Sequence, residues 1–208
     1  MIIFIYRLSS KDQDKSMCGR LSIIDYPLCK IVSETTGVNF NSESNDNLCP
    51  SESVSTIVQS HEQLTQVNMQ WGIQPSWSKR LLINAQSETV AIKPTFAQAF
   101  AANRCLIPCS GWYEWRKEGS KKQKYYFSHA QEQPLYMAGV SYYGVSTQPQ
   151  VVILTTKPNS LCEQYHHRMP VLILPENINV WLQSTSSSSN LSPLMSAIPE
   201  QHLQVITN

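Results

Sequence analysis

The chain has 208 residues, of which 41% are hydrophobic and 15% are charged. This length suits one domain with a substantial core, and the composition excludes an intrinsically disordered chain. The net charge of +1 at pH 7 excludes binding to nucleic acid through overall basicity, so an anion-binding surface has to be a local patch.

The first sixteen residues are predicted to be an N-terminal extension, either a misassigned start or a removed leader. Their apolar run covers only Met1–Tyr6, no basic residue precedes it, and the charged stretch KDQDK follows without a small-residue cleavage site. A secretory signal would need those parts. No run approaches the roughly 20 apolar residues of a membrane span. We therefore expect a soluble cytoplasmic protein whose domain covers residues 17–208.

Cys18 follows a methionine, Met17, that can serve as a translation start. An internal cysteine is usually a small buried hydrophobe. A cysteine at the first position instead carries an α-amine, with a pKa of about 8, beside its thiol. Such an amine condenses with an aldehyde to an imine, and the thiol then closes a five-membered thiazolidine ring on the same carbon. Because this chemistry needs a free terminus, we favour Met17 as the start over cleavage of the leader.

Short runs rich in β-branched and aromatic residues recur between turn signals. They predict strands over 55–59, 65–71, 124–130, 134–145 and 150–156. Helices are predicted over 29–38, 95–104 and 175–183. The serine-rich tract 184–190 has no periodicity and is predicted to be a flexible surface loop. Since strands and helices do not alternate regularly, we predict an α+β fold: a single compact domain, mainly antiparallel and barrel-like, with short helices.

The segment 71–89 combines an aromatic side chain, cations and an amide. Trp77 is followed by Lys79 and Arg80, a composition that stacks an unpaired base and holds the nucleic-acid backbone. A tryptophan at the edge of the core explains Trp77 equally well. Asn84, at the end of an apolar run, is by itself a turn or cap residue.

Two further segments carry groups that move protons. Glu114, in GWYEW, is either a solvated residue on an outer strand face or a partly desolvated acid with a raised pKa. His166 and His167 are adjacent and cannot both point at one site from a regular element. A histidine titrates near neutrality, and Arg168 beside the pair can hold a phosphate bidentately. The alternative is a loop that closes onto the following apolar strand.

The six cysteines lie at irregular spacings without a Cys-x-x-Cys pair. In a chain of this size we expect them to be reduced thiols. A zinc site would need two close pairs, and Cys105 with Cys109 is the only candidate half. No metal and no organic cofactor is expected.

Eight segments, taken in their order and spacing, match one family. They are MCGR (17–20), NLCPSE (47–52), WGIQPSW (71–77), INA followed by ET (83–89), RCLIPCSGWYEW (104–115), AGV (138–140), ILTT (153–156) and HHRMPVLIL (166–174). On these segments the chain resembles the SOS-response-associated peptidase family, the abasic site processing proteins. The resemblance implies a compact α+β domain that binds single-stranded DNA containing abasic sites in the DNA damage (SOS) response. It also implies a covalent crosslink between the N-terminal cysteine and the abasic-site aldehyde.

The resemblance also implies a role for each matching residue. Cys18 corresponds to the nucleophile, whose amine and thiol capture the aldehyde as a thiazolidine. Asn84 corresponds to the residue that positions the sugar, Glu114 to the acid/base that assists ring opening, and His166 to the histidine that shuttles protons to the sugar oxygen. The expected DNA contacts are Arg20, Trp77, Thr155 and Arg168. A nucleoid-associated monomer without membrane contact is expected.

One departure from the family pattern concerns the residue two after Asn84. The family commonly has arginine there, whereas this chain has Gln86. Loss of one ionic contact is expected to weaken DNA binding and to lower its salt dependence by roughly one counterion. Lys79 or Arg80 would be the compensating cation.

Two other functions compete with the crosslinking reaction. In a cysteine peptidase, Cys18, His166 and Asn84 would be the nucleophile, the base and the orienting residue. We expect such activity to be mainly self-processing that exposes Cys18. Strand cleavage by β-elimination is expected instead as a lyase reaction of the crosslinking function, when the imine does not mature to the ring. A passive single-strand-binding module would use Trp77 and the nearby cations, and would bind intact and abasic strands equally.

Overall fold

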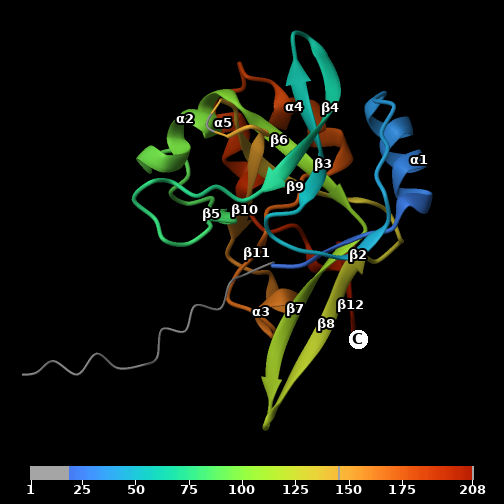
Figure 1. Cartoon of the computed structure of the whole chain (residues 1–208). Coiled ribbons are helices and arrows are strands. Elements are labelled where there is room, and N and C mark those ends of the chain that lie inside the picture. Colours follow the sequence, from blue (N-terminus) through green and yellow to red (C-terminus); the bar gives the residue numbers. More distant parts are fainter. Residues whose placement is uncertain (1–18, 145, 208) are drawn as a thin grey trace, which may run out of the picture.

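The structure, a computed structural model, describes residues 19–144 and 146–207 (Figure 1). Cys18 and the predicted extension over 1–16 lie outside the described residues. The strands are β1 (Leu21–Ile23), β2 (Asn45–Leu48), β3 (Ser53–Ser60), β4 (Gln63–Trp71), β5 (Asn84–Gln86), β6 (Arg104–Cys109), β7 (Gly111–Glu118), β8 (Lys121–His129), β9 (Leu135–Tyr142), β10 (Gln150–Thr156), β11 (Met169–Pro170) and β12 (Leu203–Thr207). The helices are α1 (Asp25–Thr36), α2 (Pro94–Ala102), α3 (Ser160–Glu163), α4 (Ile178–Leu182) and α5 (Ser188–Leu191), and the 3-10 turns are η1 (Pro175–Asn177), η2 (Pro193–Met195) and η3 (Glu200–His202).

The described strands form two sheets. One has the order β12-β8-β7-β1-β2, and the other has the order β11-β10-β4-β3-β6-β9 with β5 also paired to β10. Because β10 pairs with β9 as well, the strands β10, β4, β3, β6 and β9 close into a ring. Among the described strands, the only parallel pairings are those of β10 with β4 and with β5. The predicted α+β, mainly antiparallel and barrel-like fold is confirmed.

Three fully buried tryptophans hold the core together. Trp71 donates its indole N–H to the carbonyl of Ile83 at 3.1 Å, and Trp181 donates to the carbonyl of Cys105 at 2.9 Å. Trp112 on β7 stacks on Phe127 of β8 with ring centroids 4.8 Å apart. The two indole N–H groups are thus buried with their hydrogen bonds satisfied, and the rings fix the elements that carry the site.

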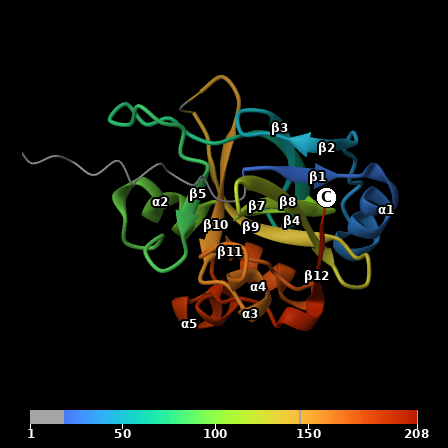
Figure 2. The same cartoon turned by 90° about the horizontal axis from the view of Figure 1, so that it is seen from below.

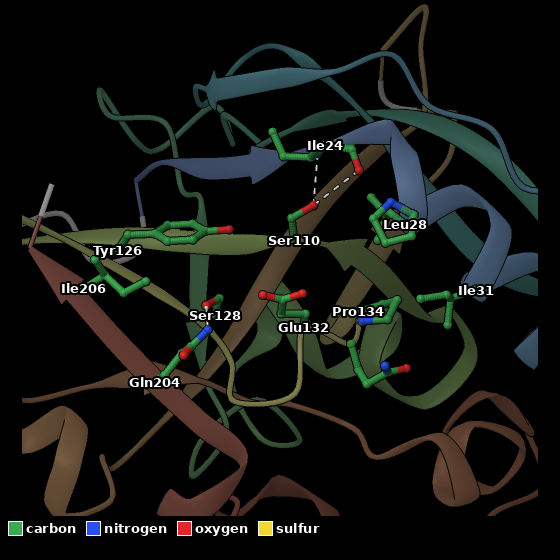
Figure 3. A pocket seen from close by; sticks show the side chains of 12 residues that line it. Ile24, Leu28, Ile31, Ser110, Tyr126, Ser128, Glu132, Pro134, Gln204 and Ile206 are labelled. Atoms are coloured by element: carbon green, nitrogen blue, oxygen red, sulfur yellow. Dashed lines mark hydrogen bonds between the residues drawn. The ribbon is translucent and has the colours of Figure 1, made fainter.

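Helix α1 lies at one end of the sheet that contains β7 and β8 (Figure 2). Its bounds begin at Asp25, four residues before the predicted start, but Tyr26 is extended, with φ −114° and ψ 129°, so the helix is kinked there. The Ser44 hydroxyl accepts a hydrogen bond from the backbone N–H of Asp25 and donates one to its carboxylate. The helix ends at Gly37, whose φ of 72° is left-handed. Between α1, β8 and β12 lies a cavity of about 300 Å³ with apolar walls that include Leu28 and Ile206 (Figure 3).

The C-terminal third differs from the sequence-based expectation in two places. The predicted helix over 175–183 is split into the 3-10 turn η1 and the short α4. The serine-rich tract 184–190 is not wholly a loop, since α5 begins within it at Ser188. The side chain of Leu191, which follows the tract, is buried and anchors this turn to the core. The polar composition of the tract does not predict such an anchor.

No helix among the described residues is long and apolar enough to cross a membrane.

Candidate functional site

The chain enters the fold beside β7. The carbonyl of Arg20 accepts a hydrogen bond from the backbone N–H of Tyr113 at 3.1 Å, and β1 then runs between β7 and β2. Glu114 is the next residue along β7. In the sequence, Cys18 is only two residues before Arg20. The backbone that leads to the predicted nucleophile is therefore fixed next to the predicted acid/base.

Glu114 is buried, with 5% of its surface exposed. It lies on the same face of β7 as Trp112, which packs into the core. Burial raises the pKa of the Cys162 thiol in α3 to about 12, and the charge of Glu114 adds to that shift. Of the two sequence-based alternatives for Glu114, the structure supports the desolvated acid over the solvated surface residue.

His166 follows α3 and is tied to it through the backbone. Its N–H donates to the carbonyl of Cys162 at 3.0 Å, and the residue is only 7% exposed. Its ring Nδ1 lies 3.2 Å from the backbone nitrogen and 3.3 Å from the backbone oxygen of Arg168. The backbone of Arg168 therefore engages Nδ1 in either tautomer of the ring. His167 is exposed, and its ring centroid lies 4.3 Å from that of His166.

Arg168 is held by a carboxylate and a carbonyl. Its Nη1 and Nη2 donate to Oε1 and Oε2 of Glu88 at 2.6 and 2.7 Å, and Nη2 also donates to the carbonyl of Thr155 at 2.6 Å. The hydrogen bonds from Arg168 hold the pKa of Glu88 below its usual value. Thr155 itself is buried, and its hydroxyl contacts the carbonyl of Ala85 at 3.3 Å. Both expected DNA contacts thus make internal contacts in this structure.

Strand β5 presents Asn84 and Gln86 on one face. Asn84 lies opposite Ile153 and Gln86 opposite Thr155 in a parallel pairing with β10, while Ala85 between them is buried. Gln86 is exposed and Asn84 is half-buried. The position where the family commonly carries a cation is therefore open to solvent, on the same face as the residue expected to position the sugar.

Trp77 lies on the long loop between β4 and β5. It is 68% exposed, and with Pro94 and Tyr142 it lines a cavity of about 360 Å³. The loop is closed at its base by a bridge between Ile73 and Leu82. An exposed indole beside a cavity fits the base-stacking alternative better than a tryptophan at the edge of the core.

Sequence-predicted residues thus gather from several elements. β5, β10 and the segment before β11 bring together Asn84, Thr155 and Arg168, and α3 links His166 to Glu114. Arg20 adjoins Glu114 through β7, and Trp77 stands on its own loop. Sequence reasoning gave no role to Glu88, although it is the partner of Arg168. The two residues are 80 positions apart, and no local pattern marks such a pair.

The chain is similar to known proteins along most of its length. The family model described as SOS response associated peptidase (SRAP) matches residues 17–207. The abasic site processing protein YoqW of Bacillus subtilis is 32% identical over 147 residues, which cover 65% of each chain. The abasic site processing protein YedK of Escherichia coli is 29% identical over 152 residues, covering 71% of this chain and 68% of its own. The match with YoqW therefore spans about two thirds of that relative.

Solved structures share the fold at low identity. A phage-related protein from Bordetella bronchiseptica aligns with a TM-score of 0.77 at 23% identity, covering 92% of this chain and 94% of its own. A protein from Bacteroides thetaiotaomicron aligns with a TM-score of 0.68 at 24% identity, covering 91% and 84% of the two chains.

Proposed function

Because the chain belongs to the SOS response associated peptidase (SRAP) family, we propose that it processes abasic sites in DNA, with Cys18 as an N-terminal nucleophile. The observation that supports this most is the burial of Glu114 and His166 around one helix, α3, beside the backbone that leads to Cys18. The relatives YoqW and YedK are both named abasic site processing proteins.

The proposed reaction begins with opening of the deoxyribose ring to its C1′ aldehyde. The amine of Cys18 adds to the aldehyde carbon, and the resulting carbinolamine loses one water to form an imine. The thiol sulfur then bonds to the same carbon while its proton passes to the nitrogen, which closes the thiazolidine. Glu114 protonates the departing hydroxyl, and His166 exchanges a proton with the sugar ring oxygen through Nε2. Asn84 orients the sugar, so that proximity assists each step.

The proposed substrate is an abasic site in single-stranded DNA. The exposed indole of Trp77 offers a surface on which an unpaired base stacks, and duplex DNA presents no free base for it. The other proposed DNA contacts are Arg20, Thr155 and Arg168. We also propose two associated reactions. One is self-processing that frees the amine of Cys18. The other is strand cleavage by β-elimination from an imine that does not close to the thiazolidine.

Replacing the nucleophile tests the proposal directly. Cys18→Ser is expected to abolish the crosslink to an abasic oligonucleotide that survives a denaturing gel, because the ring needs the thiol. The variant keeps the terminal amine, so borohydride should still trap its imine. The intact mass of the purified protein shows which residue is first.

The matched control is Cys29→Ser, which changes a half-buried thiol on α1. It is expected to crosslink as the unsubstituted protein does. An undiminished crosslink from Cys18→Ser, with the chain beginning at residue 18, would rule out the thiazolidine. Equal affinity for intact and abasic strands without any covalent product would instead indicate a passive binding module.

A further inference from the structure

The hairpin of β7 and β8 concentrates the positive charge of the chain. It projects from the body, and its tip is the lowest point of the coloured ribbon in Figure 1. Five of the sixteen lysines and arginines lie in or beside its turn: Arg116, Lys117, Lys121, Lys122 and Lys124. A single acid, Glu118, lies among them, so the remainder of this nearly neutral chain is net acidic.

The two faces of the hairpin differ in how their charges are paired. On the inner face, Arg116 donates to Glu118 and, at 3.1 Å, to the backbone carbonyl of Gln164 after α3. On the outer face, Lys117 lies directly opposite Lys122, and Lys124 lies opposite Trp115. Among the described residues, no carboxylate forms an ion pair with any of these three lysines. Of the four hairpin lysines without an ion pair among the described residues, three therefore lie on the outer face and one, Lys121, lies on the inner face.

A pair of like charges directly across two antiparallel strands is destabilising. Lys117 and Lys122 form such a pair in the register of the hairpin. The outer-face lysines instead lie over aromatic rings: Lys124 Nζ is 3.6 Å from the ring centroid of Tyr113, and Lys122 Nζ is 5.6 Å from that of Trp115. A pair of like charges that costs stability and has no carboxylate partner is typical of a surface that binds a ligand, here one of negative charge.

The outer face is continuous with the candidate site. Leu21 lies opposite Trp112, so the next pair in the register places Arg20 opposite Tyr113 on the outer face. From Tyr113 to Lys117 the strand covers about 13 Å. On the β2 side this face meets the carboxylate of Asp46, which accepts hydrogen bonds from Tyr113 and Ser22. The cationic surface thus runs from Arg20 toward the hairpin tip and not toward β2.

We propose that the outer face of the β7–β8 hairpin, defined by Lys117, Lys122, Lys124 and Trp115, binds the phosphate backbone of the DNA strand that flanks the abasic site. The identification of DNA as the polyanion rests on the proposed function. Lysines on this face neutralise phosphates, and the half-buried ring of Trp115 offers a stacking surface for a base, whereas Tyr113 is buried. An acidic polypeptide would use the charges but not the ring.

The test removes two outer-face charges. Lys117→Gln/Lys122→Gln is compared with Lys30→Gln/Lys121→Gln, which removes equal charge from α1 and from the inner face of the hairpin. The probe is an intact single-stranded oligonucleotide, and its affinity is measured against salt concentration. Because the outer-face variant neutralises two fewer phosphates, the slope of log K against log salt should fall by about 1.4. The ratio of the affinity of the unsubstituted protein to that of the outer-face variant should then fall about sevenfold as salt rises from 50 to 200 mM.

Folding is checked by the melting temperature. The outer-face variant should melt at the same or a higher temperature than the unsubstituted protein, because the repulsion between Lys117 and Lys122 is removed. Equal salt slopes for the two double variants would overturn the proposal. Competition by polyglutamate as strong as that of DNA would also overturn it, because it would identify the partner as an acidic polypeptide.

Crosslinking to an abasic oligonucleotide is measured separately. The control variant Lys30→Gln/Lys121→Gln should crosslink as the unsubstituted protein does, and the outer-face variant should need a higher DNA concentration to reach the same extent. A protein that never crosslinks would contradict the proposed function, while the salt slopes on intact DNA would still decide the role of the hairpin.

Discussion

Arg168 connects three parts of the candidate site through one side chain. Its guanidinium ties Glu88, after β5, to Thr155 of β10, and its backbone contacts the ring of His166. The side chain is only 11% exposed, so its charge is neutralised by Glu88 rather than by solvent. We infer that it positions His166, whatever contact it also makes with a phosphate.

Glu88→Gln is expected to destabilise the protein by about 1 kcal/mol, a value limited by the partial exposure of the carboxylate. Because the pKa of Glu88 is lowered in the folded state, its contribution is fully present above the ordinary value of 4.5 and is lost as the pH falls below it. The measurement is the melting temperature of the variant and of the unsubstituted protein from pH 3 to 7. Their difference should be largest near neutrality and should vanish in acid.

The control for this prediction is Glu34→Gln, which removes an exposed partner of Lys30 within one helix, at 3.9 Å. It should change the melting temperature little at any pH. If Glu88→Gln behaves like the control, the pair contributes no stability and cannot hold the site together.

Single residues were predicted from sequence only where their chemistry is unusual. A glutamate flanked by aromatic residues and a histidine pair beside an arginine are rare enough to attract notice, and both belong to the candidate site. The ion pair of Arg168 with Glu88 was not predictable. The local sequence around an arginine does not tell whether it pairs with a carboxylate of the protein or binds a phosphate of a ligand.

Strand β7 serves two surfaces, because side chains alternate along it. Glu114 points to the candidate site, and the neighbouring Trp115 belongs to the outer cationic face. The strand begins at Gly111, where a Cβ atom would collide with the carbonyl oxygen of Phe127 and lie 2.5 Å from the Tyr126 ring. The absence of a side chain there allows β7 and β8 to pair in this register.

Gly111→Ala is expected to cost about 2–3 kcal/mol, since backbone atoms of β8 must move. For a chain of this length that is a fall of roughly 5–10 °C in melting temperature. Gly119→Ala at the hairpin turn is the control. It meets no atom within 4 Å and adds only the strain of a left-handed φ of 59°, about 1 kcal/mol. Equal losses for the two variants would show that the β7–β8 register tolerates a side chain at its start.

Elements were predicted well where alternation or composition was strong, as in β3, β4 and β10. The short elements that place the site were not predicted. β5 has three residues and β11 has two, so their pairing with β10 is decided by tertiary contacts and not by a local pattern.

At the scale of the whole molecule, one continuous core links both sheets and α3. Cys105, Cys109 and Cys162 are all buried in it, and burial raises the pKa of each thiol. Cys29 and Cys49 are half-buried outside the centre of the core. The five described cysteines are free thiols, so their reactivity reports how the molecule opens.

A thiol-specific reagent at neutral pH is expected to modify Cys29 and Cys49 in the native protein. Cys105, Cys109 and Cys162 should react only as fast as the whole domain unfolds, and all three at one rate. Peptide mapping by mass spectrometry at increasing denaturant follows each site separately. Early modification of Cys162 alone would mean that α3 opens independently, and that Glu114 and His166 are not held in one rigid unit.

The fold class and the domain were predictable because they depend on many residues at once. The order of strands in each sheet was not. β1 pairs with β7 and β2 through contacts between segments that are far apart in the chain. No local sequence pattern indicates which strands will pair in this way.

The pairing of β1 with β7 can form only after β7 has been synthesised. Trp112, opposite Leu21, is made about 90 residues later, so at the usual 5–20 residues per second β1 waits roughly 5–20 s for that neighbour. During this interval the start of the nascent chain has not yet docked on β7. The order of strands therefore makes the docking of β1, and with it the hydrogen bond between Arg20 and Tyr113, a late event in synthesis.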